Sequence, residues 1–315
     1  ARLDQQLNFL QRKGITTEAQ HGLDATLKRI LDLIHKVLPT DGSKVEGIGI
    51  SAPGPLNPQT GVIVAPPNLP GWHNVPLGDI LHEEFNVPVY VGNDANVAVL
   101  AEVARGAALD SRNAIYITVS TGIGGGVITD GRLLLGKDGL AAEVGHMVLI
   151  VDGGRVSSLE KEAAGPALAR QSRQRIAAGE KSLITDLVNG NLDDIGGKHV
   201  GNAAEQGDKL ALDVISYGGR ILGLGIVTLL HLFNPEVIVI GGGVSNVGDL
   251  LFNPMREAIE KHSLDRAYWE NLQIKRAALK DDVSIVGAAA LVVTQGGVKD
   301  VTTAIARLDS DVDLR

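Results

Sequence analysis

The sequence predicts an α/β fold with mixed sheets, because short β-type runs alternate with helical patterns along most of the chain. Glycine is unusually frequent, at 39 of 315 residues, and the glycines cluster beside apolar β-type runs at 122–126, 153–154 and 241–243. The hydrophobic fraction of 44% and the charged fraction of 21% are typical of globular proteins, which argues against disorder, collagen and coiled coil. A length of 315 residues suggests about two domains.

Charge and composition exclude several function classes. The net charge of −8 argues against an extended surface for DNA or RNA, which needs clustered Lys and Arg. The chain has no cysteine, which excludes disulfides, iron–sulfur clusters and thiolate zinc. Its longest apolar stretch, Ile221–Phe233, is too short to span a bilayer, and the first residues have no signal-peptide core. We therefore expect a cytoplasmic protein that does not interact with a membrane.

The first part of the chain alternates helices and strands. Apolar residues recur at helical spacing after Gly22. Two short β-type runs follow: the first ends before Pro53, which stops regular structure, and the second ends shortly before Asp94. The segments Pro58–Gly61 and Pro66-Pro67 are expected to form loop. The expected elements are helices over Leu23–Leu38, Leu77–Phe85 and Asp94–Ala107, and strands over Val45–Ser51 and Val87–Val91.

The second part repeats this alternation. Asp130-Gly131 is a strong hairpin-turn signal between two short strands within Gly126–Leu135. The expected strands are Asn113–Ser120 and Glu236–Ile240, and the expected helices are Leu159–Ala178, Ala203–Phe233, Leu250–His262 and Gly287–Thr294. Glycines within the second of these helices suggest close helix packing. We place the domain boundary near residues 108–112.

The segment Ser120–Gly126 is a glycine-rich loop that follows a strand. A Rossmann loop would open a helix, but the residues that follow form a hairpin. A Walker A loop is also excluded, because Gly131–Asp138 has the glycine spacing without the Ser or Thr that holds magnesium. The turn amides could bind an anion, or the glycines could simply allow tight turns.

Two further groups of polar residues could carry chemistry. Asp94, with Asn93 and Asn96, lies between a strand and a helix, so it is either an N-cap or a base that takes a proton from a polyol. A di-iron bundle needs more carboxylates, and a zinc site needs more soft or imidazole ligands, than Glu143, His146 and Glu160 provide. They could hydrogen-bond sugar hydroxyls, or they could belong to an ordinary surface turn.

Taken together, these motifs resemble the ROK family of repressors, open reading frames and kinases, in particular its glucokinase-type members. No single motif is decisive, but six occur in family order over nearly the whole chain. The matching segments are Gly47–Pro55, Pro67–Trp72, Val91–Asn96, Ser120–Gly126, Glu143–His146 and Asn234–Gly243.

The resemblance implies an actin/hexokinase-like (ribonuclease-H-like) fold, with two lobes around a cleft that binds sugar and ATP. The implied small lobe covers residues 1–109 and is completed by a helix near 287–295. The large lobe covers 110–286, and residues 296–315 are a polar tail. The resemblance implies that Asp94 is the general base. It assigns the sugar to Gly54, Asn68, Asn93, Asp94, Glu143, His146 and Glu160, and ATP to Thr121, Gly122, Gly124, Gly125, Gly242 and Gly243.

Two departures from the family pattern leave the function open. The Asp-x-Gly-Gly-Thr loop of family kinases, which contacts phosphate and Mg²⁺, is absent, and Gly14–Glu18 is the nearest segment. The family's cysteine-rich zinc turn is missing between His146 and Glu160, so no structural zinc is expected. Either the protein has lost both elements or the sequence omits a leading segment and a turn.

Three functions follow from the resemblance. The first is an ATP- and Mg²⁺-dependent kinase of a hexose or N-acetylhexosamine. The second is a sugar-sensing transcriptional regulator, which would bind nucleic acid only through a further N-terminal segment. The third is a sugar-binding protein without activity. Self-association into a homodimer or homotetramer is implied by the family in each case.

Overall fold

The structure, a computed structural model that describes residues 1–304, consists of two compact units. The first unit comprises residues 1–114, 126–141 and the chain from 278 onward, and the second comprises 115–125 and 142–277. The strand β9 passes from the second unit to the first between Gly125 and Gly126. Of the polar tail expected at 296–315, residues 305–315 lie outside the described part of the chain.

The first unit alternates short strands with helices, as the sequence predicts. The expected helix over Leu77–Phe85 is confirmed with both bounds. The elements of this unit are β1 (Arg2–Leu3), β2 (Phe9–Gln11), α1 (Leu23–His35), β3 (Ile48–Ala52), β4 (Leu56–Asn57), β5 (Val62–Ile63), β6 (Val75–Pro76), α2 (Leu77–Phe85), β7 (Val89–Asn93), α3 (Asp94–Arg105), β10 (Arg132–Leu133) and α10 (Val283–Val293).

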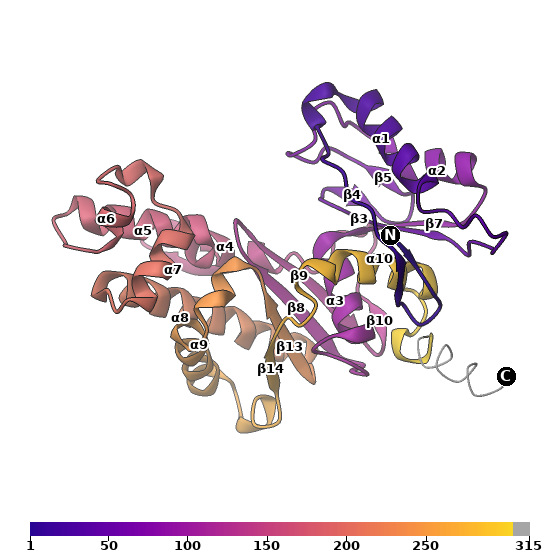
Figure 1. The fold of residues 1–315 in the computed structure, drawn as a ribbon. Coiled ribbons are helices and arrows are strands. Elements are labelled where there is room, and N and C mark those ends of the chain that lie inside the picture. Colours follow the sequence, from indigo (N-terminus) through magenta and orange to yellow (C-terminus); the bar gives the residue numbers. More distant parts are fainter. Residues whose placement is uncertain (305–315) are drawn as a thin grey trace. The chain divides into compact units, whose positions relative to one another are not determined.

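The strands β3 and β7 run parallel and lie between two layers of helices (Figure 1). Helices α1 and α2 pack on one face through a core that includes the fully buried Ile63 and Leu81. Helix α10 approaches β3 so closely that a Cβ on Gly49 would lie 1.7 Å from the carbonyl oxygen of Ala288. The register pairs Ala52 with Asn93, so the carboxyl ends of both strands meet at one edge.

The residues 58–61, expected as loop, are a turn that joins two strands of a small antiparallel sheet with the order β4-β5-β6. The side chain of Asn57 accepts hydrogen bonds from the backbone N–H groups of Gln59 (2.9 Å) and Thr60 (3.2 Å). This Asx turn reverses the chain between β4 and β5. Sequence analysis missed these strands because each contains only two residues.

The second unit is built around a sheet and several helices (Figure 1). Within this unit the strands are neighbours in the order β9-β8-β13-β14, and β13 and β14 run parallel. The residues of β9 that pair antiparallel with β10 belong to the first unit. The elements are β8 (Ala114–Val119), β9 (Ile123–Thr129), β11 (Val148–Asp152), β12 (Arg155–Ser158), α4 (Leu159–Ala163), α5 (Gly165–Ala177), α6 (Ile184–Leu187), α7 (Gly197–Glu205), α8 (Lys209–Phe233), β13 (Val237–Gly241), α9 (Asp249–His262) and β14 (Gln273–Arg276).

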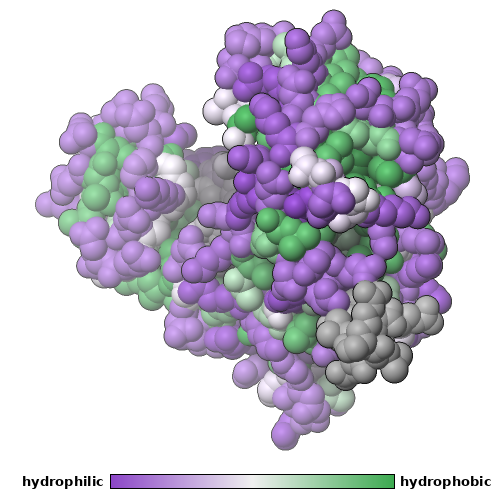
Figure 2. Space-filling view, turned by 45° about the vertical axis from the view of Figure 1, so that its right-hand side comes forward, coloured by the Kyte–Doolittle hydropathy of each residue, from purple (hydrophilic) through white to green (hydrophobic). Residues whose placement is uncertain are grey.

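Helix α8 is the long apolar helix of the second unit. By length and composition it could cross a membrane, but 67% of its most apolar window is buried, as in a core helix. A Cβ on Gly219 would lie 2.5 Å from the carbonyl oxygen of Leu251, and one on Gly223 would lie 2.4 Å from that of Met255. The sequence predicts close helix packing at these glycines, and the structure shows that the partner is α9. On the face drawn in Figure 2, hydrophilic residues predominate and hydrophobic ones form scattered patches.

The structure differs from the sequence prediction at the helix expected over Leu159–Ala178. Two helices, α4 and α5, replace it, because Ala164 has an extended backbone with φ −69° and ψ 159°. Pro166 lies in the first turn of α5, where a proline is well tolerated. The N–H of Gly165 donates to the carbonyl oxygen of Ser120 at 2.8 Å, so the break attaches these helices to the glycine-rich loop.

Candidate active site

In the first unit, Asn93 and Asp94 lie at the junction of β7 and α3. The side-chain oxygen of Asn93 accepts hydrogen bonds from the N–H groups of Ala95 (2.8 Å) and Asn96 (3.3 Å). Asn93 is therefore the N-cap of α3, and Asp94 is the first helical residue. Of the two sequence interpretations of Asp94, the N-cap is wrong.

Asp94 is an exposed residue, and one oxygen of its carboxylate accepts the N–H of Ala95 at 2.8 Å. Desolvation by the surrounding protein raises the pKa of Asp94, and the hydrogen bond from Ala95 opposes this rise only in part. A carboxylate with a raised pKa accepts protons more readily at neutral pH than an ordinary aspartate. The geometry and the electrostatics therefore suit a general base.

The other two candidate sugar-binding residues of this unit lie in loops after β3 and β5. A Cβ on Gly54 would lie 3.4 Å from the side-chain nitrogen of Asn93, so the structure brings Gly54 and Asn93 together. Asn68 is exposed in the turn between Pro66 and Trp72. The structure gives Asn68 no hydrogen bond to the other residues between 1 and 304.

In the second unit, the glycine-rich loop follows β8. It turns sharply, since the N–H of Ser120 donates to the carbonyl oxygen of Gly122 at 2.8 Å. Thr121, at the tip, is exposed, and Gly124 and Gly125 follow within β9. The loop thus presents a hydroxyl and backbone amides, which are the groups that bind phosphate oxygens.

Glu160, on helix α4, faces this loop. Its carboxylate accepts the N–H of Ile123 at 2.8 Å, and a Cβ on Gly122 would lie 2.7 Å from the same oxygen. The side chain is only partly exposed. Gly122 is therefore required for the close approach of Glu160 to the loop.

Glu143 and His146 flank a single 3₁₀ turn that packs on β9. A Cβ on Gly145 would lie 2.0 Å from the carbonyl oxygen of Ile123, and one on Gly125 would lie 2.7 Å from the side chain of Val144. Both Glu143 and His146 are exposed. Within the second unit, this turn and Glu160 are therefore attached to the same strand as the glycine-rich loop.

The second glycine cluster lies at the carboxyl end of β13, beside β8 in the sheet. Gly242 has a φ of +85°, and a Cβ there would lie 2.4 Å from the carbonyl oxygen of Val119. Gly243 has open space around it. The structure therefore brings the loops after β8 and β13 together at one edge of the sheet, where α/β proteins bind ligands.

Sequence analysis missed a polar cluster around Glu162, which lies on α4 two residues after Glu160. The carboxylate of Glu162, whose side chain is 3% exposed, accepts hydrogen bonds from Ser157 (2.5 Å) and Tyr217 (2.7 Å) and pairs with Arg155. Burial raises the pKa of Glu162, but the hydrogen bonds from Ser157, Tyr217 and Arg155 together lower it below the ordinary value. Burial and the bond to Glu162 raise the pKa of Tyr217 to about 12.

The Glu162 cluster fastens the hairpin of β11 and β12, which follows His146 directly. The hairpin turns at Gly153 and Gly154, whose φ angles of 52° and 84° fit a two-residue turn. The paired glycines were the sequence signal for it. Among residues 1–304, no group of three or more His, Asp or Glu that could hold a metal ion occurs.

Comparisons with known proteins agree with the motifs. The model of the ROK family matches residues 1–295. A glucokinase of Thermotoga maritima is 35% identical over 289 residues, covering 90% of both chains. A xylose repressor of Caldicellulosiruptor bescii is 32% identical over 85% of this chain and 68% of its own. The chain belongs to the ROK family.

Solved structures of ROK proteins show the same fold. A ROK family glucokinase of Streptomyces griseus, solved with glucose and AMPPNP, is 32% identical with a TM-score of 0.73, covering 92% of this chain and 93% of that one. The predicted actin/hexokinase-like α/β class with mixed sheets is confirmed. The ROK family contains both kinases and repressors, so the residues of the candidate site must decide between these activities.

Proposed function

We propose that the protein is an ATP-dependent sugar kinase that phosphorylates glucose or a similar hexose. The observation that carries this proposal is the division of roles between Asn93 and Asp94. Because Asn93 caps helix α3, the carboxylate of Asp94 is available to a substrate. A regulator that only senses sugar needs no proton acceptor at this position.

Asp94 would act as the general base. The sugar hydroxyl gives its proton to the Asp94 carboxylate while its oxygen attacks the γ-phosphorus of ATP. The bond between the γ-phosphorus and the bridging oxygen breaks, and ADP leaves with that electron pair. Asn93, Gly54 and Asn68 would position the sugar in this unit, in the roles that the family resemblance implies.

The loops after β8 and β13 would hold the nucleotide. The Thr121 hydroxyl and the amides of Gly122, Gly124 and Gly125 would bind phosphate oxygens, and Gly242 and Gly243 would lie against the adenosine. Phosphoryl transfer depends mainly on such alignment and on neutralisation of charge. Mg²⁺, which kinases hold largely through the phosphates, would supply charge neutralisation when bound with ATP.

Glu143, His146 and Glu160 would bind the ring hydroxyls. Glu160 is the best supported of the three, since its carboxylate is fixed beside Gly122 and Ile123. A carboxylate fixed in this way still has a second oxygen with which to accept a hydrogen bond from a hydroxyl. Such a site discriminates against sugars that lack the hydroxyl, because a polar group covered by the bound sugar is then left unpaired.

The proposal also includes a homodimer or homotetramer and a location in the cytoplasm. Neither is required for the chemistry described above. The carboxylates and His146 would bind any ring with suitable hydroxyls. Glucose is favoured because a related glucokinase is 35% identical and another was solved with glucose.

The test is an ATP-consumption assay with Mg²⁺ over a panel of hexoses and N-acetylhexosamines, using the full-length natural protein. We expect turnover on glucose that saturates at a KM of about 1 μM to 1 mM. Sugar binding by calorimetry without ATP consumption on any member of the panel would overturn the proposal and favour a sugar sensor.

A further inference from the structure

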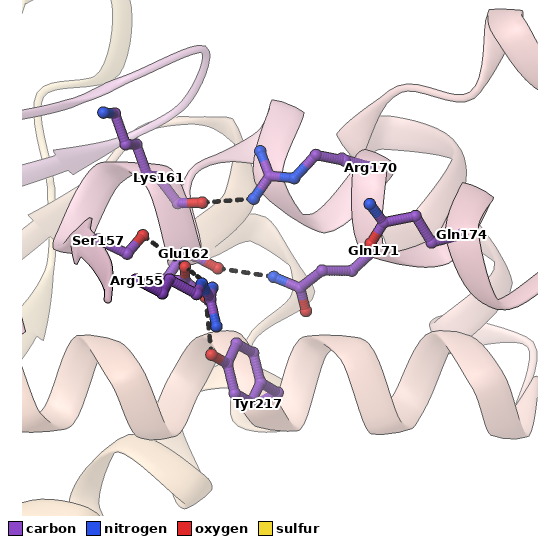
Figure 3. Close-up of a pocket in the computed structure, with 8 residues that line it drawn as sticks. All are labelled: Arg155, Ser157, Lys161, Glu162, Arg170, Gln171, Gln174 and Tyr217. Carbon is purple, nitrogen blue, oxygen red and sulfur yellow. Dashed lines mark hydrogen bonds and ion pairs between the residues drawn. The ribbon is translucent and has the colours of Figure 1, made fainter. Parts of the chain in front are cut away.

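The second unit contains a pocket of about 660 Å³ that the kinase mechanism does not use (Figure 3). It lies among β12, α4, α5 and α8, and its size is typical of small-molecule sites, which span about 300–1,000 Å³. All eight lining side chains are polar, and Tyr217 is the only aromatic one. The lining is therefore mainly polar and suits a polar ligand better than a hydrophobic one.

The lining carries a formal charge of +2 within a chain of net charge −8. The positive side chains are Arg155, Lys161 and Arg170, and Glu162 is the sole carboxylate. Glu162 is buried and its oxygens are occupied by Arg155, Ser157 and Tyr217. Lys161 and Arg170 therefore dominate the potential of the open part of the pocket.

The hydrogen-bond donors are held in place before any ligand binds. Arg170 donates to the carbonyl oxygen of Lys161 at 2.6 Å, and Gln171 donates to that of Glu162 at 3.0 Å. These bonds fasten α5 to the last carbonyls of α4 (Figure 3). Arg170 keeps further N–H groups for a ligand, because a guanidinium has five donors.

Two more donors are available beside these. Neither the ammonium group of Lys161 nor the side-chain amide of Gln174 has a hydrogen-bond partner among residues 1–304, and both side chains are exposed. Gln174 lies one helical turn after Arg170, so both are on the same face of α5. Arg170, Gln174 and Lys161 together provide a guanidinium, an amide and an ammonium group.

We propose that this pocket binds a phosphate-bearing small molecule, either a phosphomonoester such as a sugar phosphate or inorganic phosphate itself. A phosphate dianion offers several acceptor oxygens, and charge-assisted hydrogen bonds to it are the strong ones. A nucleotide fits less well, because Tyr217 is the single aromatic ring of the lining and the guanidinium of Arg220 already lies over it, 5.9 Å from the ring centroid. The proposal concerns binding alone and does not depend on the kinase activity.

The experiment titrates the full chain with inorganic phosphate in one arm and with glucose 6-phosphate in the other. Calorimetry is performed in phosphate-free buffer, with glucose and the ATP analogue AMPPNP present at saturation so that the proposed catalytic site is occupied. A dissociation constant below about 1 mM is expected in at least one arm. Equal affinities would identify the phosphate group as the ligand, and tighter binding of the sugar phosphate would identify the phosphomonoester.

Lys161→Glu tests the assignment, with Lys198→Glu as its matched control. Lys198 is an exposed residue of α7 outside the pocket. Because both variants replace lysine by glutamate, they change the net charge equally. Lys161→Glu should raise the dissociation constant at least about tenfold, and Lys198→Glu should change it less than about twofold. Gln174→Ala, which keeps the charge, should also weaken binding.

Unchanged melting temperatures will establish that these exposed positions were replaced without unfolding. Absence of binding below about 1 mM in both arms would overturn the proposal. Equal losses in Lys161→Glu and Lys198→Glu would also overturn it, because binding would then follow the net charge and not the pocket.

Discussion

The carboxylate of Glu160 accepts a hydrogen bond from the backbone N–H of Ile123 at 2.8 Å. This bond joins helix α4 to the first residue of strand β9, directly after the glycine-rich loop. A group proposed to bind sugar is thereby fixed against the segment proposed to bind phosphate. The hydrogen bond between Glu160 and Ile123 is possible because residue 122 is glycine, since a side chain there would collide with the carboxylate.

Glu160→Ala should weaken sugar binding more than turnover. The variant removes a hydrogen-bond acceptor, and loss of a bond to a charged group costs about 1.5–3 kcal/mol. We therefore expect the KM for glucose to rise about tenfold or more. Steady-state kinetics measure this, with the exposed Glu205→Ala on α7 as the matched control. An unchanged KM in Glu160→Ala would remove Glu160 from the site.

Gly242→Ala should destabilise the second unit, whereas Gly243→Ala should not. The φ of +85° at Gly242 is unfavourable for alanine, and the added Cβ would lie 2.4 Å from the carbonyl oxygen of Val119. Strain and overpacking together should cost about 2–4 kcal/mol in the free energy of unfolding. Gly243 has nothing within 4 Å of an added Cβ, so a change within about 0.5 kcal/mol is expected.

Urea unfolding of the two glycine variants at neutral pH measures this difference. If both variants lose the same amount of unfolding free energy, the backbone of the loop after β13 does not have the conformation described above. If Gly242→Ala is instead as stable as the parent, Gly242 cannot have the backbone conformation described above.

Glu162→Gln should reduce stability at neutral pH. The lowered pKa of Glu162 means that its ionised form is favoured by folding, so this stabilisation is present above the ordinary pKa of 4.5. It is lost as the pH falls through the lower pKa of the folded state. The variant should cost about 1–3 kcal/mol at pH 7, since one acceptor of a buried network is weakened.

The difference in unfolding free energy between Glu162→Gln and the parent should therefore shrink as the pH is lowered. Denaturant unfolding at several pH values from neutral into the acid range gives this comparison. A difference that is the same at every pH would contradict the role of the Glu162 charge in holding the hairpin of β11 and β12.

Regular elements were predictable where the sequence pattern was long. The helix over Leu77–Phe85 was predicted with both bounds, and the hairpin at Asp130-Gly131 is confirmed by φ angles of 49° and 76°. Both depend on local signals: apolar spacing in the helix, and residues that tolerate positive φ in the turn. The long-range partners of these elements are not encoded locally.

Two failures have physical causes. The helix predicted over Leu159–Ala178 breaks because the Gly165 amide bonds to Ser120, a partner more than forty residues away that spacing cannot reveal. The hairpin of β11 and β12 was missed although Gly153-Gly154 is a turn signal. Its strands are held by Glu162, and nothing in the sequence shows that this carboxylate is buried.

The candidate site was predictable in its residues but not in their division of roles. Asn93 and Asp94 are adjacent polar residues, and either could cap a helix that begins there. Only the backbone geometry decides that the helix begins at Asp94, with Asn93 as the cap. The sequence motif therefore points to the position and the structure separates cap from base.

The rate of sugar phosphorylation should fall at acid pH because of Asp94. A general base must be deprotonated, and desolvation raises the pKa of Asp94 above its ordinary value of 3.8. We therefore expect the acid limb of the pH profile of kcat/KM to lie above pH 3.8. A flat profile down to that pH, with the protein still folded, would contradict the raised pKa.

Asp94→Asn provides the most direct test of the proposed mechanism. Since Asn93 is the cap, the variant keeps the capping bonds of α3, and its melting temperature should change little. Loss of a positioned base costs about 10²–10⁴ in rate, so kcat should fall at least about a hundredfold while sugar binding persists. The measurement is kcat for the best sugar of the panel, in parent and variant side by side. A variant kcat within a few-fold of the parent value would contradict the assignment of Asp94 as the general base.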